Sequence, residues 1–332
     1  MSPSVSPSRA WYLAVCLCLL PLADANLPGQ ILTSSAPDVP FRIHKRVEEV
    51  RVLFNVADKH GRPIVNLEPQ DVVVVDDGQP VSSFTDFSRP TVLPRLTMLV
   101  DASASMAGNF LAERAAAQRM LNVGSGASAA VVPWTTLSRE MPKPEKRRLS
   151  NWRFPAVLPV GGVQPDSLSG LHPSGATAML DALSIVMQRP PSSAEKQSVR
   201  RVILLLSDGE DNTSRHTLEE VLEVAQRKEV AIYAVDVHNP HLEFPGDRVL
   251  RSLCEGTGGR FFLFPNYSNA ESALVQIESD LRSGYAVSFH PRVSSRDDRE
   301  HAHSLSIKIR NHRHLRVQMR KSYYLSAGEP FP

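Results

Sequence analysis

The chain reads LTMLVDASAS at residues 96–105 and RVILLLSDG at residues 201–209. In both stretches a continuous apolar run leads directly into aspartate and serine residues. Such runs, without polar alternation, are typical of strands that are covered on both faces in a parallel sheet. We therefore predict that both runs are central parallel strands whose polar ends lie at the carboxyl edge of one sheet.

Between these two stretches in the chain, SGAT at residues 174–177 stands directly before a helical pattern. In chain order, residues 96–105, 174–177 and 201–209 are the first, second and third stretches. Because ligands bind outside the carboxyl ends of strands in open α/β sheets, the three stretches are expected to meet. Their candidate ligands are two carboxylates and three hydroxyls, and the stretches contain neither Cys nor His. An oxygen-only set suits a hard cation. The sequence therefore predicts a site for Mg²⁺ or Mn²⁺ formed by Asp101, Ser103, Ser105, Thr177 and Asp208.

Strand-like and helix-like segments alternate between residues 93 and 284. Two of the helices are expected to begin with capping boxes, one formed by Thr217 with Glu220 and the other by Ser268 with Glu271. Strands that alternate with helices of this length imply right-handed βαβ units and a mostly parallel sheet. The predicted fold class is α/β, with a Rossmann-like, doubly wound sheet.

Segments rich in β-strand pattern flank this α/β domain on both sides, at residues 47–92 and 285–326. Neither flank has enough strands to bury a core alone. We predict that the two flanks pair with each other and form a small β-sandwich-like region. Residues 26–46 are rich in Ser, Pro and Ala and are predicted to be a linker.

The first 25 residues have the pattern of a secretory signal peptide. The apolar run Trp11–Leu22 is followed by Ala23-Asp24-Ala25, which fits a cleavage site. A membrane anchor is the alternative, but the run falls short of the roughly 20 residues needed to span a bilayer. The mature protein is thus expected to be secreted or periplasmic, without a transmembrane anchor.

Cleavage after Ala25 would remove Cys16 and Cys18 and leave Cys254 alone. No intrachain disulfide is then possible in the mature protein. Cys254 stands on the apolar face of a short predicted helix, with Leu250 and Leu253. We expect it to be a buried apolar residue and not a reactive thiol.

The composition excludes few function classes by itself, because the net charge is only +2. Near the C-terminus, the basic residues are mixed with Asp297, Asp298 and Glu300, which argues against nucleic-acid binding. The histidines His301, His303, His312 and His314 are predicted to lie on turns and on the solvent-facing side of a β-ribbon. A transition-metal tract is the alternative interpretation of the same residues.

The sequence carries none of the sought enzyme signatures, namely HExxH, GxSxG and the phosphate-binding GxxxxGK. We therefore expect no catalytic residues and no enzymatic activity. Asp101 and Asp208 would in principle hold Mg²⁺ for phosphoester hydrolysis. However, the polar ends of the three stretches, at residues 101–105, 174–177 and 207–209, contain no Lys or Arg to clamp a phosphate.

The combination of Asp101-x-Ser103-x-Ser105, Thr177 and Asp208-Gly209 resembles the metal-ion-dependent adhesion site of von Willebrand factor type A (VWA) domains. The resemblance covers about residues 95–284. The flanks resemble those of the bacterial von Willebrand factor A-related proteins typical of acidobacteria. That similarity rests on the turns at residues 59–63 and 76–80 and on the terminal residues 320–324.

The resemblance implies a role for each candidate ligand. Ser103 and Ser105 would coordinate the metal directly, and Thr177 directly or through water. Asp101 and Asp208 would act mostly through bound waters and hydrogen bonds. A divalent ion without a direct carboxylate ligand remains strongly electrophilic. The implied partner is therefore a protein that presents Asp or Glu as the last ligand.

Three functions remain open from the sequence. The first is metal-dependent binding of a partner protein, in the manner of an adhesion module. The second is a metal-assisted phosphoester hydrolase that uses Asp101 and Asp208. The third is a scaffold whose metal site is vestigial.

Overall fold

The computed structural model describes residues 49–90, 95–123, 130–134, 172–188, 200–292, 301–310 and 314–325. The predicted signal peptide, the linker at 26–46 and most of the Pro-rich stretch between Ser138 and Ser174 lie outside these residues. Among the residues that the structure describes, no helix combines the length and hydropathy needed to cross a membrane.

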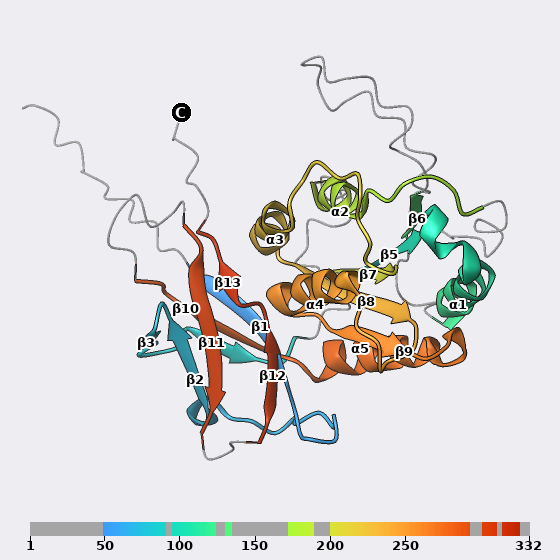
Figure 1. The fold of residues 1–332 in the computed structure, drawn as a ribbon. Helices are drawn as coiled ribbons and strands as arrows, with labels where there is room; N and C mark the ends of the chain where they lie inside the picture. The colour runs from blue at the N-terminus through green and yellow to red at the C-terminus, as the bar shows by residue number, and fades with distance from the viewer. Residues whose placement is uncertain are drawn as a thin grey trace, which may run out of the picture. The chain divides into compact units, whose positions relative to one another are not determined.

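A parallel sheet forms the centre of the α/β domain (Figure 1). Its strand order is β6-β5-β7-β8-β9, and each neighbouring pair is parallel. β7 is apolar and buried after Arg201, and β8 is buried at every residue, as expected for strands covered on both faces. The strands are β5 (Arg95–Asp101), β6 (Ala130–Trp134), β7 (Arg201–Leu206), β8 (Val230–Val237) and β9 (Phe261–Phe264).

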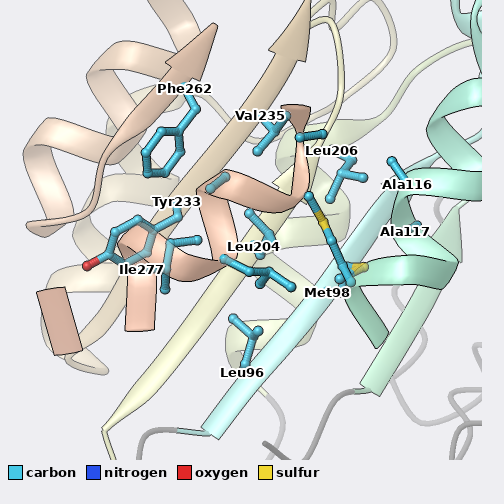
Figure 2. Close-up of a cluster of buried hydrophobic side chains, with 14 of the residues drawn as sticks. Leu96, Met98, Ala116, Ala117, Leu204, Leu206, Tyr233, Val235, Phe262 and Ile277 are labelled. Atoms are coloured by element: carbon cyan, nitrogen blue, oxygen red, sulfur yellow. The ribbon is translucent and has the colours of Figure 1, made fainter. Parts of the chain in front are cut away.

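Helices cover both faces of this sheet, which confirms the predicted doubly wound α/β fold. On one face, α1 (Phe110–Val123) and α5 (Glu271–Ser283) pack on the strands. Figure 2 shows part of that core, in which Tyr233 lies beside Ile277 on one side, and Ala116 and Ala117 lie on the other. On the other face, the core includes residues of α2 (Met179–Gln188), α3 (Leu218–Arg227) and α4 (Pro245–Thr257).

The capping box predicted at the start of α3 is present. The Thr217 hydroxyl accepts from the backbone N–H of Glu220, whose carboxylate accepts in return from the N–H of Thr217. The box predicted from Ser268 and Glu271 is wrong. Asn266 caps a short 3₁₀-helix, η6 (Tyr267–Asn269), by accepting from the N–H of Ser268, and α5 follows it directly. Because Asn266 caps η6, the helical segment begins before Ser268, the predicted N-cap.

Two antiparallel four-stranded sheets form the β-sandwich-like region, with strand orders β12-β1-β10-β4 and β13-β11-β2-β3. Residues from both sheets share one apolar cluster, which makes the two sheets a sandwich. The strands are β1 (Val50–Ala57), β2 (Val72–Asp76), β3 (Gln79–Pro80), β4 (Asp86–Ser88), β10 (Tyr285–Phe289), β11 (His303–Ile309), β12 (Arg316–Met319) and β13 (Ser322–Tyr323).

The strands of each sheet come from both ends of the described chain. β1 pairs with β10 and β12, and β2 pairs with β11. Every second side chain of β1 points into the shared core, including Val52 and Phe54. The turn between β2 and β3 uses Asp77 and Gly78, both in the left-handed region of φ, which suits the twist of a tight hairpin.

The prediction that His303 lies on a solvent-facing surface is wrong. His303 begins β11 and is buried, with its Nδ1 atom 2.7 Å from Oδ2 of Asp77 and its ring stacked on Tyr323. The hydrogen-bonding carboxylate of Asp77 explains how the imidazole of His303 is accommodated in the protein interior. Because Asp77 stands at a hairpin turn far away in sequence, this pairing was not visible from the alternation of β11 itself. His301 and His314 are exposed, and His312 lies outside the described residues.

Candidate metal centre

Asp101 ends β5, Ser207 directly follows the neighbouring parallel strand β7, and the two side chains touch each other. In the register of β5 and β7, Val100 pairs with Leu206, so the next residues lie side by side at the carboxyl edge. The Ser207 hydroxyl donates to Oδ2 of Asp101 at 2.6 Å, and the backbone N–H of Ser103 donates to Oδ1 at 2.9 Å. Both oxygens of this fully buried carboxylate are therefore held in place.

The two serine hydroxyls of the first stretch lie together beyond Asp101. The Oγ atoms of Ser103 and Ser105 are 3.0 Å apart. Ser103 is buried at the N-cap of a 3₁₀-helix, η2 (Ala104–Gly108), whereas Ser105 is exposed. The pair thus runs from the protein interior to the surface, which leaves one side open to a ligand from outside.

Backbone hydrogen bonds join the second stretch to the first. The N–H of Ala104 donates to the carbonyl of Gly175 at 3.0 Å, and the N–H of Ser174 donates to the carbonyl of Ala102 at 2.9 Å. Gly175 has a φ of 75°, a left-handed conformation that glycine adopts without strain. This pairing holds the loop before α2 against the loop of residues 101–105, which we call the serine loop.

Thr177 is buried and is held by Asn212 and Thr213, which follow the third stretch. Its carbonyl accepts from the N–H of Asn212 and from both the N–H and the hydroxyl of Thr213. Its own N–H donates to Oδ1 of Asn212 at 3.1 Å. The backbone of Thr177 is therefore fixed from both sides, which leaves its hydroxyl as the group available to a metal.

Asp208 follows Ser207 and is partly exposed. Gly209 has a φ of 73°, and its N–H donates to the Ser207 hydroxyl at 3.0 Å. A Cβ atom on Gly246 would clash with the carbonyl oxygen of Asp208. The loop of Asp208 and Gly209 thus packs directly on the first turn of α4, and glycine is needed on both sides.

Hydrogen bonds therefore connect all three stretches, as the sequence predicted, and each of the five candidate ligands lies on one of the connected loops. Ser207 connects the third stretch to Asp101 of the first. The backbone bonds of Ser174 with Ala102 and of Ala104 with Gly175 connect the second stretch to the first. Asn212 and Thr213, just after the third stretch, bond to Thr177 of the second. The arrangement fits a hard cation, because the hydroxyl and carboxylate groups stand on loops that hydrogen bonds already hold together.

The electrostatics of this edge also favour a cation. Burial raises the pKa of Asp101 to about 6, hydrogen bonds from Ser207 and Ser103 offset part of that effect, and the charge of Asp208 raises the pKa further. Bringing a divalent ion to these like charges would remove their mutual repulsion. The two carboxylates are thus better satisfied with a metal than without one.

Glu113 adds a carboxyl group that the sequence interpretation missed. It lies in the first turns of α1, is fully buried, and neither of its oxygens has a hydrogen-bond partner among the described residues. Burial and the charges of Asp101, Asp208 and Asp236 raise its pKa well above the ordinary value. The signal in the sequence was weak, since a glutamate in a first helical turn is usually solvated.

The model of the von Willebrand factor type A domain family matches residues 166–276. The chain contains a von Willebrand factor type A domain. The matched range includes Thr177 and Asp208 and begins after the serine loop. Domains of this family are usually binding modules without catalysis.

Solved structures with a similar fold include proximal thread matrix protein 1 from the mussel byssus, at 16% identity and a TM-score of 0.40. That match covers 62% of this chain and 50% of the mussel chain. The same mussel protein with a zinc-occupied MIDAS motif matches at 15% identity and a TM-score of 0.42, over 61% of this chain and 48% of that one. This chain thus spans about half the length of the mussel protein.

A von Willebrand factor type A protein from Catenulispora acidiphila matches at 12% identity and a TM-score of 0.40. The match covers 85% of this chain and 74% of that chain. No curated protein matches the chain.

The VWA domain also contains a Ser–His–Asp arrangement that the sequence did not reveal. Nδ1 of His216 lies 2.6 Å from Oδ1 of Asp181, and Nε2 lies 3.3 Å from the hydroxyl of Ser184. The geometry is that of a hydrolytic relay. However, Ser184 is fully buried and its Oγ accepts from the side chain of Gln188. No substrate reaches this hydroxyl, so the arrangement fixes the start of α3 against α2.

A cavity of about 370 Å³ lies away from the candidate metal centre. It is lined by Arg200 and Val230, which stand where β7 and β8 begin, and by Arg51 and Arg320 of the β-sandwich-like region. The carboxyl edge of the VWA sheet is the opposite end of these strands. The cavity therefore contributes nothing to the site of Asp101 and Asp208.

Proposed function

We propose that the VWA domain binds Mg²⁺ or Mn²⁺ through Asp101, Ser103, Ser105, Thr177 and Asp208, and through this ion binds an acidic side chain of a partner protein. The observation that carries the proposal is the hydrogen-bonded assembly of three distant loops around the serine hydroxyl pair. Loops fixed in this way present their oxygens with little reorganisation, which favours binding.

The hydrogen bonds of the carboxylates support a recognition role for the metal. Both oxygens of Asp101 already accept hydrogen bonds, and Oδ1 of Asp208 accepts from the N–H of Glu210. Hydroxyls supply the remaining candidate ligands, and they carry no charge. A divalent ion held mainly by neutral oxygens keeps its attraction for a further carboxylate.

Exposed apolar side chains near this edge support a protein partner. Among the described residues, five large hydrophobic side chains are exposed, and three of them are Leu111, Leu242 and Phe244. Leu111 lies in the first turn of α1, which follows β5, and the other two lie between β8 and α4. Both connections leave the carboxyl edge of the sheet. Apolar side chains around a charged centre are typical of protein-binding surfaces.

The metal-binding step is tested by calorimetric titration of the whole protein with Mg²⁺ and Mn²⁺, beside a Ser103→Ala/Ser105→Ala variant. We expect saturable binding in the wild type and its loss in the variant. Ser272→Ala is the matched control, because that serine is exposed and lies on α5. Equal binding by the double variant would contradict the assignment of the ligands.

The carboxylate step is tested with the bound Mn²⁺ itself, through its effect on the relaxation of water protons. N-acetylglutamic acid α-amide, whose only carboxylate is that of the side chain, is expected to displace water from the ion and lower the relaxation enhancement. N-acetylglutamine α-amide, which is nearly the same size but neutral, is expected to leave it unchanged. The same response to both compounds would argue against recognition of an acidic side chain.

The two other functions make different predictions. A metal-assisted hydrolase would turn over a phosphoester and lose that turnover in Asp101→Ala, but no observation in the described residues favours it. A scaffold with a vestigial site would bind its partner equally well in EDTA. We also propose that the protein acts outside the cytoplasm, on the strength of the signal-like residues 1–25.

A further inference from the structure

A second group of ligand-type side chains lies one strand further along the sheet. Asp236 stands near the end of β8, His238 directly follows β8, and Asp247 lies in the first turn of α4. Each offers one atom to a common region, and these three atoms lie within 4.8 Å of one another. Asp236 and Asp247 are buried, and the side chain of His238 is 16% exposed.

The imidazole of His238 is oriented by its own loop. Its Nδ1 atom lies 2.9 Å from the carbonyl oxygen of Asn239. A proton on Nδ1 donates to that carbonyl and leaves the lone pair of Nε2 free. Nε2 faces Oδ1 of Asp247 at 2.9 Å and Oδ2 of Asp236 at 3.4 Å. Metal-binding histidines characteristically donate their other ring N–H to a carbonyl or carboxylate.

Both carboxylates are oriented in the same manner. Oδ1 of Asp236 accepts from the N–H of Val237 at 2.6 Å, and Oδ2 of Asp247 accepts from the N–H of Phe244 at 2.9 Å. In each carboxylate one oxygen is therefore fixed by the backbone, and the other one faces Nε2 of His238. All three side chains have a supporting hydrogen bond behind the atom that they present.

The charge around this group favours a cation. Asp236 and Asp247 place two carboxylates next to one imidazole. Glu113 lies close enough to Asp236 that the charge of Asp236 contributes to the raised pKa of Glu113. Glu113 is fully buried and its oxygens have no partner within the described residues. A positive ion near Asp236 would lower the electrostatic cost of burying these groups.

We propose that Asp236, His238 and Asp247 form a second metal site, and that the ion is Zn²⁺. Imidazole with carboxylates suits Zn²⁺, whereas the oxygen-only set around Asp101 suits a hard cation. Three protein ligands leave a fourth position, and the exposed fraction of His238 gives water access to it. The proposal stands on its own residues and does not depend on the function of the first site.

A protonated His238 is the alternative occupant of this position. Burial lowers the pKa of His238, but the hydrogen bonds to Asp247 and to the carbonyl of Asn239 and the charges of both carboxylates raise it more. An imidazolium would then donate from Nε2 to Asp247 and neutralise part of the negative charge without any metal. The two states differ in whether Nε2 is a donor or a ligand, and metal titration distinguishes them.

The experiment uses the whole protein with Ser103→Ala/Ser105→Ala, so that the first site is silenced. Calorimetric titration with Zn²⁺ is expected to give saturable binding of one ion per chain in this background. Adding His238→Gln is expected to abolish it. His241→Gln is the matched control, because His241 is exposed on the same loop and lies outside the group.

A second variant guards against misfolding. Asp247→Asn keeps an acceptor for the N–H of Phe244 and removes the charge, so α4 retains its cap. We expect it to raise the Kd for Zn²⁺ by about tenfold or more without a change in circular dichroism. Co²⁺ in place of Zn²⁺ is expected to give the absorption bands of a tetrahedral ion.

Two results would overturn the proposal. One is the absence of saturable Zn²⁺ binding when the first site is silenced. The other is unchanged binding in a folded His238→Gln or Asp247→Asn protein, which would place the ion elsewhere and leave His238 as an imidazolium in an ion pair.

Discussion

The hydroxyl of Ser207 donates a 2.6 Å hydrogen bond to Oδ2 of Asp101, more than a hundred residues earlier in the chain. The same hydroxyl accepts from the N–H of Gly209 at 3.0 Å. Ser207 thus connects the first and third stretches of the candidate metal centre, although it is not itself a candidate ligand. Its position follows from the pairing of β5 with β7.

We predict that Ser207→Ala weakens both the fold and the metal site. The variant leaves one oxygen of a buried carboxylate without its donor, which costs about 2 kcal/mol in the free energy of unfolding. Mg²⁺ affinity is expected to fall by about tenfold or more, because the orientation of Asp101 is lost. Urea denaturation and calorimetric titration measure the two effects.

The control for this variant is Ser272→Ala, which removes an exposed hydroxyl bonded to the carbonyl of Asn269. It is expected to change neither the Mg²⁺ affinity nor the unfolding midpoint appreciably. If Ser207→Ala behaved like this control, the Asp101 carboxylate would not depend on its hydrogen bond for orientation.

We predict that Gly246→Ala disrupts the packing of α4 on the loop of Asp208 and Gly209. A Cβ atom there would clash with the carbonyl of Asp208, which is backbone and cannot rotate away. The melting temperature is expected to drop strongly, since overpacking against backbone costs about 1–3 kcal/mol or more. Thermal unfolding followed by circular dichroism measures the effect.

Gly108→Ala is the matched control for the glycine variant. A Cβ atom at Gly108 would meet nothing within 4 Å, and the residue is exposed at the end of η2. Its melting temperature is expected to stay within a degree or two of the wild type. A similar drop in both variants would show that the effect is a general response to losing glycine.

The sequence predicted the α/β fold because its signals were local. The apolar runs of β5 and β7 identify strands covered on both faces, and the polar residues directly after them identify the carboxyl edge. The pairing of β1 with β10 was predictable for a different reason, since neither flank buries a core alone. These inferences needed only strand order and hydrophobic pattern.

The unpredicted features depend on side-chain contacts between different elements of the fold. Asp236 stands at a strand end like Asp101, but its partner Asp247 lies in the next helix, and only the fold brings Asp247 to His238. The burial of His303 depends on Asp77 in the same way. Local pattern predicts which residues end a strand, but it does not predict which side chains meet there.

We predict that Cys254 reacts with thiol reagents only after unfolding. Its side chain is fully buried and burial raises the pKa of its thiol, so little thiolate is present at neutral pH. The rate of modification by a disulfide reagent is therefore expected to follow the fraction of unfolded protein in urea. Rapid modification in the absence of denaturant would show that α4 opens locally from the sheet.

Burial and neighbouring carboxylates raise the pKa of Glu113 well above its ordinary value near 4.5. In the metal-free protein above about pH 4.5, the carboxyl group of Glu113 stays protonated in the folded state, whereas in the unfolded chain it has released its proton. Folding is therefore favoured at low pH, and stability falls as the pH rises toward the raised pKa. Between those limits the free energy of unfolding is expected to fall by about 1.4 kcal/mol per pH unit from this group.

Glu113→Gln removes the titration and keeps the shape of the side chain. In EDTA, the variant and the wild type are expected to be similarly stable near pH 4, and the variant is expected to become the more stable one as the pH rises. Urea denaturation at a series of pH values measures the difference. Glu278→Gln is the control, because that side chain is 60% exposed on α5. Parallel stability curves for Glu113→Gln and the wild type would mean that Glu113 finds a partner or solvent when it ionises.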